Sequence, residues 1–293
     1  MNANQLRFGI EVETLIAKSM RLSEKVRLGS HHGGGHQVPY LPTGWKAERD
    51  HSITTRGGYC SCEIISPILR SADGLAEVVE VLRILDAKGH RITRPSCAVH
   101  VHVSWKGSLP ADALLRLVST VAHCERGLFA ITGTKYRERS GYCNGVRKYG
   151  NVEYAQNVIE HDRNHALNLV KLARRERRAV EFRVFSGSIC PVQICGWIQV
   201  CLGLVERAIN DEHPPAWKPK PFKGERETVG EHAGAGMGEG ASEVERLINF
   251  LAWGVDYGSV YDDRQFGWVS DIVPQELVKA EFRRLAAKYD SQP

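Results

Sequence analysis

Three short segments of the sequence each place two chemistry-bearing residues two positions apart. They are Glu11-Val12-Glu13, His100-Val101-His102 and Glu181-Phe182-Arg183. Because side chains alternate between the two faces of a β-strand, both members of each pair would point to the same side. The intervening and flanking residues are apolar and would face a hydrophobic core. The spacing therefore predicts three strands that present carboxylates, imidazoles and a guanidinium on one surface.

The residue types on this surface favour a site for divalent metal ions. A solvated sheet face, the ordinary alternative for any one strand, usually carries Thr, Lys, Ser and Gln instead. Clustered carboxylates repel one another unless cations neutralise them, and carboxylate oxygens with a single His suit Mg²⁺ or Mn²⁺ better than Zn²⁺. Glu63 adds a carboxylate near a strand end, with a surface position as its alternative. Arg183 could bind a transferring phosphate or form a salt bridge with a neighbouring glutamate, Glu11, Glu13 or Glu63.

The elements that must position these residues follow from hydrophobic periodicity. Alternating segments predict strands at 6–15, 45–50, 63–65, 98–105, 166–172 and 179–185. Helical spacing predicts helices at 71–88, capped by Ser71, and at 110–132, 192–209, 242–253 and 275–289. The basic run 174–178 could bind an acidic substrate or nucleic acid, but a solvated turn between two strands is the more common role of such a run. We expect an α+β fold with a mostly antiparallel, curved sheet and helices packed on one face.

The chain is expected to fold around one main domain. Residues 1–212 would form the catalytic domain and 242–293 a C-terminal helical extension packed on it. Between them, residues 213–241 are rich in Pro and then Gly, a composition typical of a flexible loop. A lid function for this loop is a further possibility, although a linker is the simpler interpretation.

The overall composition is that of an ordinary globular protein. The 293 residues carry 39 Lys+Arg against 34 Asp+Glu, with 42% hydrophobic and 25% charged residues, which excludes disordered, collagen-like and disulfide-stapled chains. A net charge of +5 does not require nucleic acid, which we do not expect as a partner. No signal peptide is visible, and the apolar stretch 189–205 is too short and polar for a membrane span. Eight cysteines without a CxxC pair predict reduced thiols and a cytoplasmic location.

The chemistry-bearing segments also resemble a known family when they are taken in order. The set comprises Phe8-Gly9-Ile10-Glu11-Val12-Glu13, Trp45 through Asp50 with Ser52, Glu63-Ile64-Ile65-Ser66-Pro67, His100-Val101-His102-Val103, Arg139-Ser140-Gly141-Tyr142-Cys143, Asn168-Leu169, and Glu181-Phe182-Arg183 with Gly187. It resembles the amidoligase family, which belongs with the carboxylate–amine ligases related to glutamine synthetase and glutamate–cysteine ligase. The sequence departs from the family pattern at Ala98, where Gly is frequent, and at His51, where a small residue is usual.

The resemblance implies a glutamine-synthetase-like catalytic fold and an enzyme that uses ATP and Mg²⁺, or Mn²⁺, to join a carboxylate to an amine through an acyl phosphate. The product would be an amide or isopeptide bond, and the amine an amino acid, peptide or polyamine, with a protein acceptor also open. The implied metal ligands are Glu11, Glu13, Glu63, His100 and Glu181. The other implied roles are phosphate binding by Arg183, nucleotide contacts by Ser104 and by His102, which could instead support a metal ligand, amine orientation or deprotonation by Asp50, and substrate carboxylate binding by Arg139.

Two other functions are compatible with the same residues. His100 and His102 with nearby glutamates could hold Zn²⁺ and activate water in a hydrolase. The chain could also be a non-catalytic binding module on a ligase fold, although all the implied ligands are present. No Gly-rich phosphate motif occurs, so nucleotide binding depends on the resemblance alone.

Other groups could also do chemistry, but an ordinary role suits each of them better. Cys143 could be a nucleophile or a packed thiol. His31, His32 and His36 could bind metal or lie in an exposed loop. The C-terminal aromatics Trp253, Tyr257, Tyr261, Phe266 and Trp268 could form core or line a pocket.

Overall fold

The computed structural model of the chain describes residues 6–30, 34–55, 57–110, 112–210, 243–250 and 272–292. Within these residues the strands form one seven-stranded sheet in the order β2-β3-β4-β1-β5-β7-β6, and every neighbouring pair is antiparallel. The strands are β1 (Arg7–Ala17), β2 (His36–Gln37), β3 (Lys46–Glu48), β4 (Tyr59–Ile65), β5 (Ala98–Ser104), β6 (Leu167–Asn168) and β7 (Ala179–Ser186). The expected α+β class with an antiparallel sheet is confirmed.

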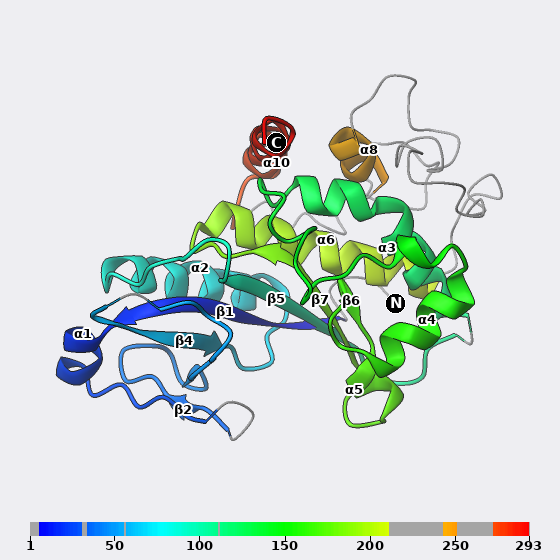
Figure 1. Cartoon of the computed structure of the whole chain (residues 1–293). Helices are drawn as coiled ribbons and strands as arrows, with labels where there is room; N and C mark the ends of the chain where they lie inside the picture. Colours follow the sequence, from blue (N-terminus) through cyan, green and yellow to red (C-terminus); the bar gives the residue numbers. More distant parts are fainter. Residues whose placement is uncertain are drawn as a thin grey trace.

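The long helices lie on one face of this sheet (Figure 1). Next to the strands are α2 (Ser71–Ala87) and α6 (Pro191–Asn210), and beyond them are α3 (Ala113–Ala130), α8 (Glu243–Phe250) and α10 (Gln275–Asp290). Short helices α1 (Lys18–Ser23), η2 (Arg147–Tyr149), α4 (Val152–His161) and α5 (Val170–Ala173) lie outside this stack. The periodicity did not predict α1 or α4.

The apolar face of the sheet packs on these helices as the alternation predicts. Val12, Val99, Val101 and Phe182 are all fully buried in one continuous core. Removing this much apolar surface from water is the main stabilising contribution to such a fold. The apolar face therefore fixes which way the charged face must point.

The edge of the sheet is also tied to the helix layer. Trp45, just before β3, is fully buried and donates a hydrogen bond from Nε1 to Glu77 Oε1 on α2 at 2.6 Å. This bond satisfies the polar atom that a buried indole would otherwise leave unpaired.

A bulge in β7 changes the predicted alternation. Val99 pairs with Phe185 but Val101 pairs with Phe182, so two residues of β7 lie opposite the single residue His100 of β5. A bulge of this kind bends a strand and redirects its side chains. As a result Phe185, and not Val184, pairs with Val99 and stacks on Trp197 of α6 with ring centroids 4.9 Å apart.

Three local predictions are wrong. The strand expected at 166–172 is only β6, and the chain then enters α5, so the basic run 174–178 connects a helix to β7 and not two strands. Ser71 does not cap α2, because Arg70 occupies the cap position and the Ser71 hydroxyl donates to the Arg70 carbonyl. α3 begins at Ala113, so Pro110 precedes the helix and accepts the Ala113 N–H.

Helix α6 corresponds to the apolar stretch considered as a membrane span. It is long and apolar enough by composition to cross a bilayer, yet 94% of its most apolar window is buried inside the structure, as in a core helix. The Pro- and Gly-rich loop at 213–241, His31, His32 and the aromatics between Trp253 and Trp268 lie outside the described residues. His36 lies in β2 and is exposed.

Candidate active site

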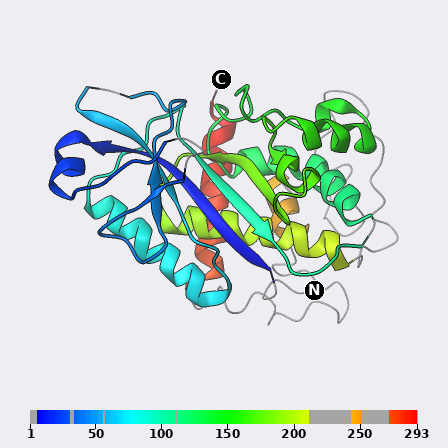
Figure 2. The same ribbon diagram turned by 90° about the horizontal axis from the view of Figure 1, so that it is seen from below.

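The strand register brings the predicted side chains together on the face of the sheet opposite the long helices. Figure 2 shows strands β1 and β5 in front of the helices when the molecule is viewed from this side. Glu11 lies opposite His100 across the β1–β5 pair, and Glu13 lies opposite Glu63 across the β1–β4 pair. Glu181 of β7 lies opposite His102 of β5.

His100 is the centre of this cluster. Its Nδ1 lies 3.2 Å from Glu11 Oε2, 3.6 Å from Glu181 Oε1 and 4.0 Å from Glu63 Oε1. Its Nε2 lies 3.7 Å from Glu13 Oε1. Four carboxylates from three strands that are widely separated in the sequence thus surround one imidazole, which is 3% exposed.

The donor set fits divalent metal ions. Two sets of three residues, Glu11 with His100 and Glu181, and Glu13 with Glu63 and His100, each offer ligand atoms within 4.8 Å of one another. Within the described residues, the buried Nε2 of His100 has no hydrogen-bond partner, which is the state expected of a nitrogen arranged for a ligand. Four carboxylates around one imidazole form a donor set rich in oxygen, which suits Mg²⁺ or Mn²⁺ better than Zn²⁺.

The pKa values of the glutamates in the cluster reflect their burial and the closeness of other charged groups. Burial, followed by the charges of Glu11 and Glu13, raises the pKa of Glu63 to about 10. Burial also raises the pKa of Glu13. Burial alone would also raise the pKa of Glu11, but His102 and His100 hold that pKa well below the usual value. The cluster is thus short of positive charge on the Glu13–Glu63 side, where a bound cation would compensate most.

Neighbouring groups hold the ligands in place. Asn168 on β6 donates from Nδ2 to Glu181 Oε2 at 2.6 Å, and Arg183 donates from Nη1 to Glu181 Oε1 at 2.5 Å. The backbone N–H of Ala98 donates to Glu13 Oε2 at 2.7 Å. Arg183 therefore pairs with Glu181, and the alternative of a salt bridge to Glu11, Glu13 or Glu63 is wrong. Partners of this kind restrict ligand orientation, as outer groups do in metal sites generally.

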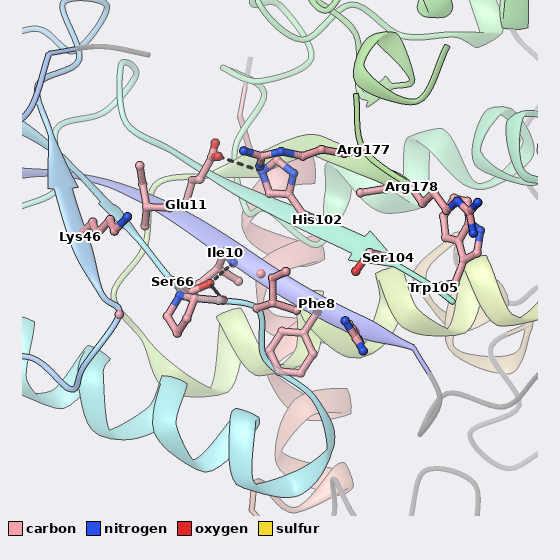
Figure 3. A pocket seen from close by; sticks show the side chains of 17 residues that line it. Phe8, Ile10, Glu11, Lys46, Ser66, His102, Ser104, Trp105, Arg177 and Arg178 are labelled. Atoms are coloured by element: carbon pink, nitrogen blue, oxygen red, sulfur yellow. Dashed lines mark hydrogen bonds and ion pairs between the residues drawn. The ribbon is translucent and has the colours of Figure 1, made fainter. Parts of the chain in front are cut away.

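One cavity, here called the His102 pocket, opens at the Glu11 end of the cluster. It has a volume of about 770 Å³, and its walls include the expected His102 and Ser104. Figure 3 shows Glu11 and His102 directed toward each other, with Lys46 on one side and Arg177 and Arg178 on the other. His102 Nε2 lies 3.1 Å from Glu11 Oε1. The basic walls beside a carboxylate cluster suit a polyphosphate.

Three basic residues of this pocket come from separate segments of the sequence, and of these segments only the run 174–178 was a candidate for binding an anion. Arg7 is on β1, Lys46 is on β3, and Arg177 lies in the turn that was expected to be solvated. Arg177 and Arg178 are exposed, as that prediction requires, yet they line the pocket. Their clustering in the sequence indicated a basic group that could bind an anion. Only the structure, which places the turn beside β5, shows that this group lines the His102 pocket.

A second cavity, here called the Asp50 pocket, opens at the Glu13 end. It has a volume of about 450 Å³ and includes Asp50, Arg139 and Arg183 together with Glu13 and His100. The two pockets therefore meet at the carboxylate cluster from opposite ends of β1. All ten predicted site residues lie in the cluster or in one of these two pockets: Glu11, Glu13, Glu63, His100, Glu181, His102, Ser104, Asp50, Arg139 and Arg183.

The Asp50 pocket also contains residues for which the sequence predicted no role. Arg137 and Arg163 add two guanidinium groups to its wall, and Tyr136 and Tyr142 lie at the same cavity with exposed fractions of 52% and 59%. Cys143, next to Tyr142, is fully buried, and burial raises the pKa of its thiol to about 11. A packed thiol is therefore the correct interpretation of Cys143 in this structure.

Glu125 on α3 anchors the loop that carries Arg137 and ends before α4. Its Oε1 accepts the N–H of Val146 at 2.5 Å, and a Cβ at Gly145 would lie 2.5 Å from Glu125 Oε2, so the loop fits closely around the carboxylate. Burial raises the pKa of Glu125 to about 7. The ionised form is thus disfavoured in the folded protein relative to the unfolded chain.

We expect the Glu125 carboxyl to make stability fall as pH rises. Its contribution is complete below the ordinary pKa of about 4.5 and is lost as pH rises through 7, a change of roughly 3 kcal/mol. Glu125→Gln keeps an acceptor for the Val146 N–H but cannot ionise. Relative to wild type, the free energy of unfolding of the variant should therefore increase between pH 4.5 and 8. Urea unfolding of both proteins at several pH values measures this, and equal pH slopes would contradict it.

Comparisons with known proteins agree with this arrangement. Residues 4–157, just over half of the chain, match the family described as "Putative amidoligase enzyme". No curated protein matches the sequence of the chain. Glu181 and Arg183 lie beyond the matched residues, and the β5–β7 pairing places them in the same cluster.

Solved structures are similar to the chain at low sequence identity. One is the ligase PafA, solved in complex with the prokaryotic ubiquitin-like protein Pup, with a TM-score of 0.52 and 10% identity over 98% of this chain and 65% of that chain. A bifunctional glutathione synthetase from Pasteurella multocida gives a TM-score of 0.46 and 9% identity over 98% of this chain and 47% of that one. The chain thus spans less than two thirds of the length of either protein. On the match over residues 4–157, the chain belongs to the amidoligase family.

Proposed function

We propose that this protein is an ATP- and Mg²⁺-dependent ligase that joins a carboxylate to an amine through an acyl phosphate. The observation that carries the proposal is the carboxylate cluster around His100 with a basic pocket at each end. Amide formation from a carboxylate in water is uphill, so the carboxylate must be activated. A metal site between two pockets would let a nucleotide enter from one side and the two substrates from the other.

The nucleotide is assigned to the His102 pocket. Lys46, Arg177 and Arg178 would contact its phosphates, and Trp105 and Ile68 offer apolar wall for the base. The five implied ligands, Glu11, Glu13, Glu63, His100 and Glu181, would hold Mg²⁺, which neutralises charge during phosphoryl transfer when bound.

The acid and the amine are assigned to the Asp50 pocket. A carboxylate oxygen of the acid attacks the terminal phosphorus of ATP, the bond to ADP breaks, and an acyl phosphate forms. Arg183 would hold the transferring phosphoryl group from the Asp50 side of the cluster. The amine nitrogen then attacks the acyl carbon, phosphate leaves with the former carboxylate oxygen, and Asp50 accepts the proton from nitrogen.

The test is incubation of the full chain with ATP, Mg²⁺ and panels of acids and amines, with ADP release and product mass as readouts. We expect ADP release to require both an acid and Mg²⁺, and to stop when a chelator removes the metal. The amide product should appear only when an amine is also present. Binding of one tight Zn²⁺ with hydrolysis independent of nucleotide would support the hydrolase instead, and ligand binding without ADP release would support a binding module.

We also propose that the amine can be an amino acid, a peptide, a polyamine or a protein, and the panel of amines in this experiment includes all four. A reducing compartment such as the cytoplasm is proposed for the activity, because all eight cysteines are free thiols.

A further inference from the structure

The loop that follows α3 forms much of the wall of the Asp50 pocket. Five of the residues that line this pocket lie between positions 136 and 142, among them Arg137 and Arg139. The backbone N–H groups of Arg139, Ser140 and Cys143 all donate to carbonyl groups of the same loop. Local bonds of this kind shape a loop but do not fix where it lies relative to the sheet. The position of the pocket wall therefore depends on contacts with other elements.

The segment at the end of α10 supplies such contacts where the loop begins. The side chain of Gln292 accepts the Lys135 N–H at Oε1 at 3.0 Å and donates from Nε2 to the Gly133 carbonyl at 3.1 Å. Lys135 Nζ donates in turn to the backbone carbonyl of Gln292. The two segments pack closely, because a Cβ at Gly133 would lie 2.6 Å from Cδ2 of Leu285. Figure 2 shows α10, in red, ending beside the green segment that includes this loop.

Tyr289 on α10 makes a second connection to the loop. Its hydroxyl donates to Glu138 Oε2, and Lys135 Nζ lies 5.6 Å from the centre of its ring. Arg137, which lies between these two loop residues in the sequence, donates from Nη2 to the backbone carbonyl of Arg183 on β7. The contacts therefore extend from α10 through the loop to the strand that contributes to the carboxylate cluster.

We propose that Tyr289 and Gln292 are positioning residues that hold the wall of the Asp50 pocket in place. Neither is among the described residues that line the pocket, so each acts through residues 133–138. The position of the wall then sets how well the pocket holds its substrates. That last step rests on the proposed function, which assigns the acid and the amine to this pocket, but the position of the wall can be measured without turnover.

Two variants of the full chain remove the contacts with little change of shape. Gln292→Met removes both hydrogen-bonding atoms of the side chain, and Tyr289→Phe removes only the hydroxyl that reaches Glu138. The probe is phenylglyoxal, which modifies guanidinium groups, with mass spectrometry as the readout.

Arg137 reports on the wall because it is only 5% exposed. We expect its labelling, relative to that of the exposed Arg83 on α2, to rise about 2- to 10-fold in each variant, the range for net loss of a hydrogen bond. Each variant tests the proposal alone, so one that fails to fold is replaced by the other. Unchanged labelling in the folded variants overturns the proposal.

ADP release shows whether the position of the wall matters to the reaction. The KM values for the acid and the amine should rise about 2- to 10-fold in each variant, while the KM for ATP, assigned to the His102 pocket, stays the same. Gln292→Glu keeps the acceptor for the Lys135 N–H and should recover part of the loss. Ser291→Ala, whose hydroxyl donates within the same segment to the Lys288 carbonyl, is the matched control and should behave as wild type. Equal changes in all three KM values would indicate a general loss of structure and overturn the proposal.

The outcomes also separate this inference from the proposed function. Faster labelling of Arg137 in the variants of a protein that releases no ADP would leave the pocket wall dependent on α10 and refute the ligase. ADP release by wild type, with faster labelling but unchanged KM values in the variants, would support the ligase and overturn the positioning role.

Discussion

Glu11→Gln is expected to lower ADP release at least about 100-fold, the effect of removing one preorganised charge from a phosphoryl-transfer site. Glu11 belongs to one of the two three-residue ligand sets and lies 3.2 Å from His100 and 3.1 Å from His102. Its pKa lies well below the usual value because the two imidazoles outweigh the effect of burial. The carboxylate is therefore ionised at neutral pH, and Gln removes a full negative charge at nearly constant shape.

The measurement is ADP release over a range of Mg²⁺ concentrations, together with direct Mn²⁺ binding by the folded variant. We expect Mn²⁺ affinity to fall by at least about tenfold, as loss of a ligand or its support generally produces. Glu80→Gln, an exposed glutamate on α2, is the matched control and should behave as wild type. A folded Glu11→Gln variant with unchanged ADP release and Mn²⁺ binding would exclude the cluster as the metal site.

Arg183→Met is expected to lower kcat by about 100- to 1000-fold while the KM for the acid changes little. Arg183 lines the Asp50 pocket beside the cluster, where its charge would act on the transferring phosphoryl group and not on the ground-state acid. Lys should restore only part of the rate, because a point charge replaces a planar guanidinium.

The pH profile distinguishes this role from a merely structural one. Burial would raise the pKa of Glu181, but His102 and Arg183 lower it, so loss of Arg183 must move that pKa upward. The acidic limb of activity should therefore shift to higher pH in Arg183→Met. A drop in rate with an unshifted profile and a raised KM would place Arg183 in substrate binding instead.

Much of the fold and most of the candidate site could be predicted from the sequence, because both depend on local alternation. Glu11, His100 and Glu181 each lie on a strand whose neighbours are apolar, and burial of those neighbours forces the polar residues to the other face. Two-residue periodicity is visible in a single segment, so the shared face could be inferred without knowing which strands are neighbours.

The partners of these side chains were decided only by the tertiary structure. The β7 bulge opposite His100 has no signature in the sequence, and it is why Phe185, and not Val184, pairs with Val99. Likewise, the sequence indicates no role for Arg137 and favours a solvated turn for Arg177, whereas packing places each of them at a cavity.

There is a physical reason why the sequence predicts the face on which a residue lies but not the residues that it contacts. Which face a residue occupies is set by the hydrophobic effect acting on its own strand, and the printed sequence contains that information. Which other residues it meets depends on strand order, register and loop position, which emerge from contacts between segments separated by as many as 170 residues, such as Glu11 and Glu181. The sequence thus determined that carboxylates and imidazoles share one surface, and the tertiary structure determined that this surface lies between two pockets with basic walls.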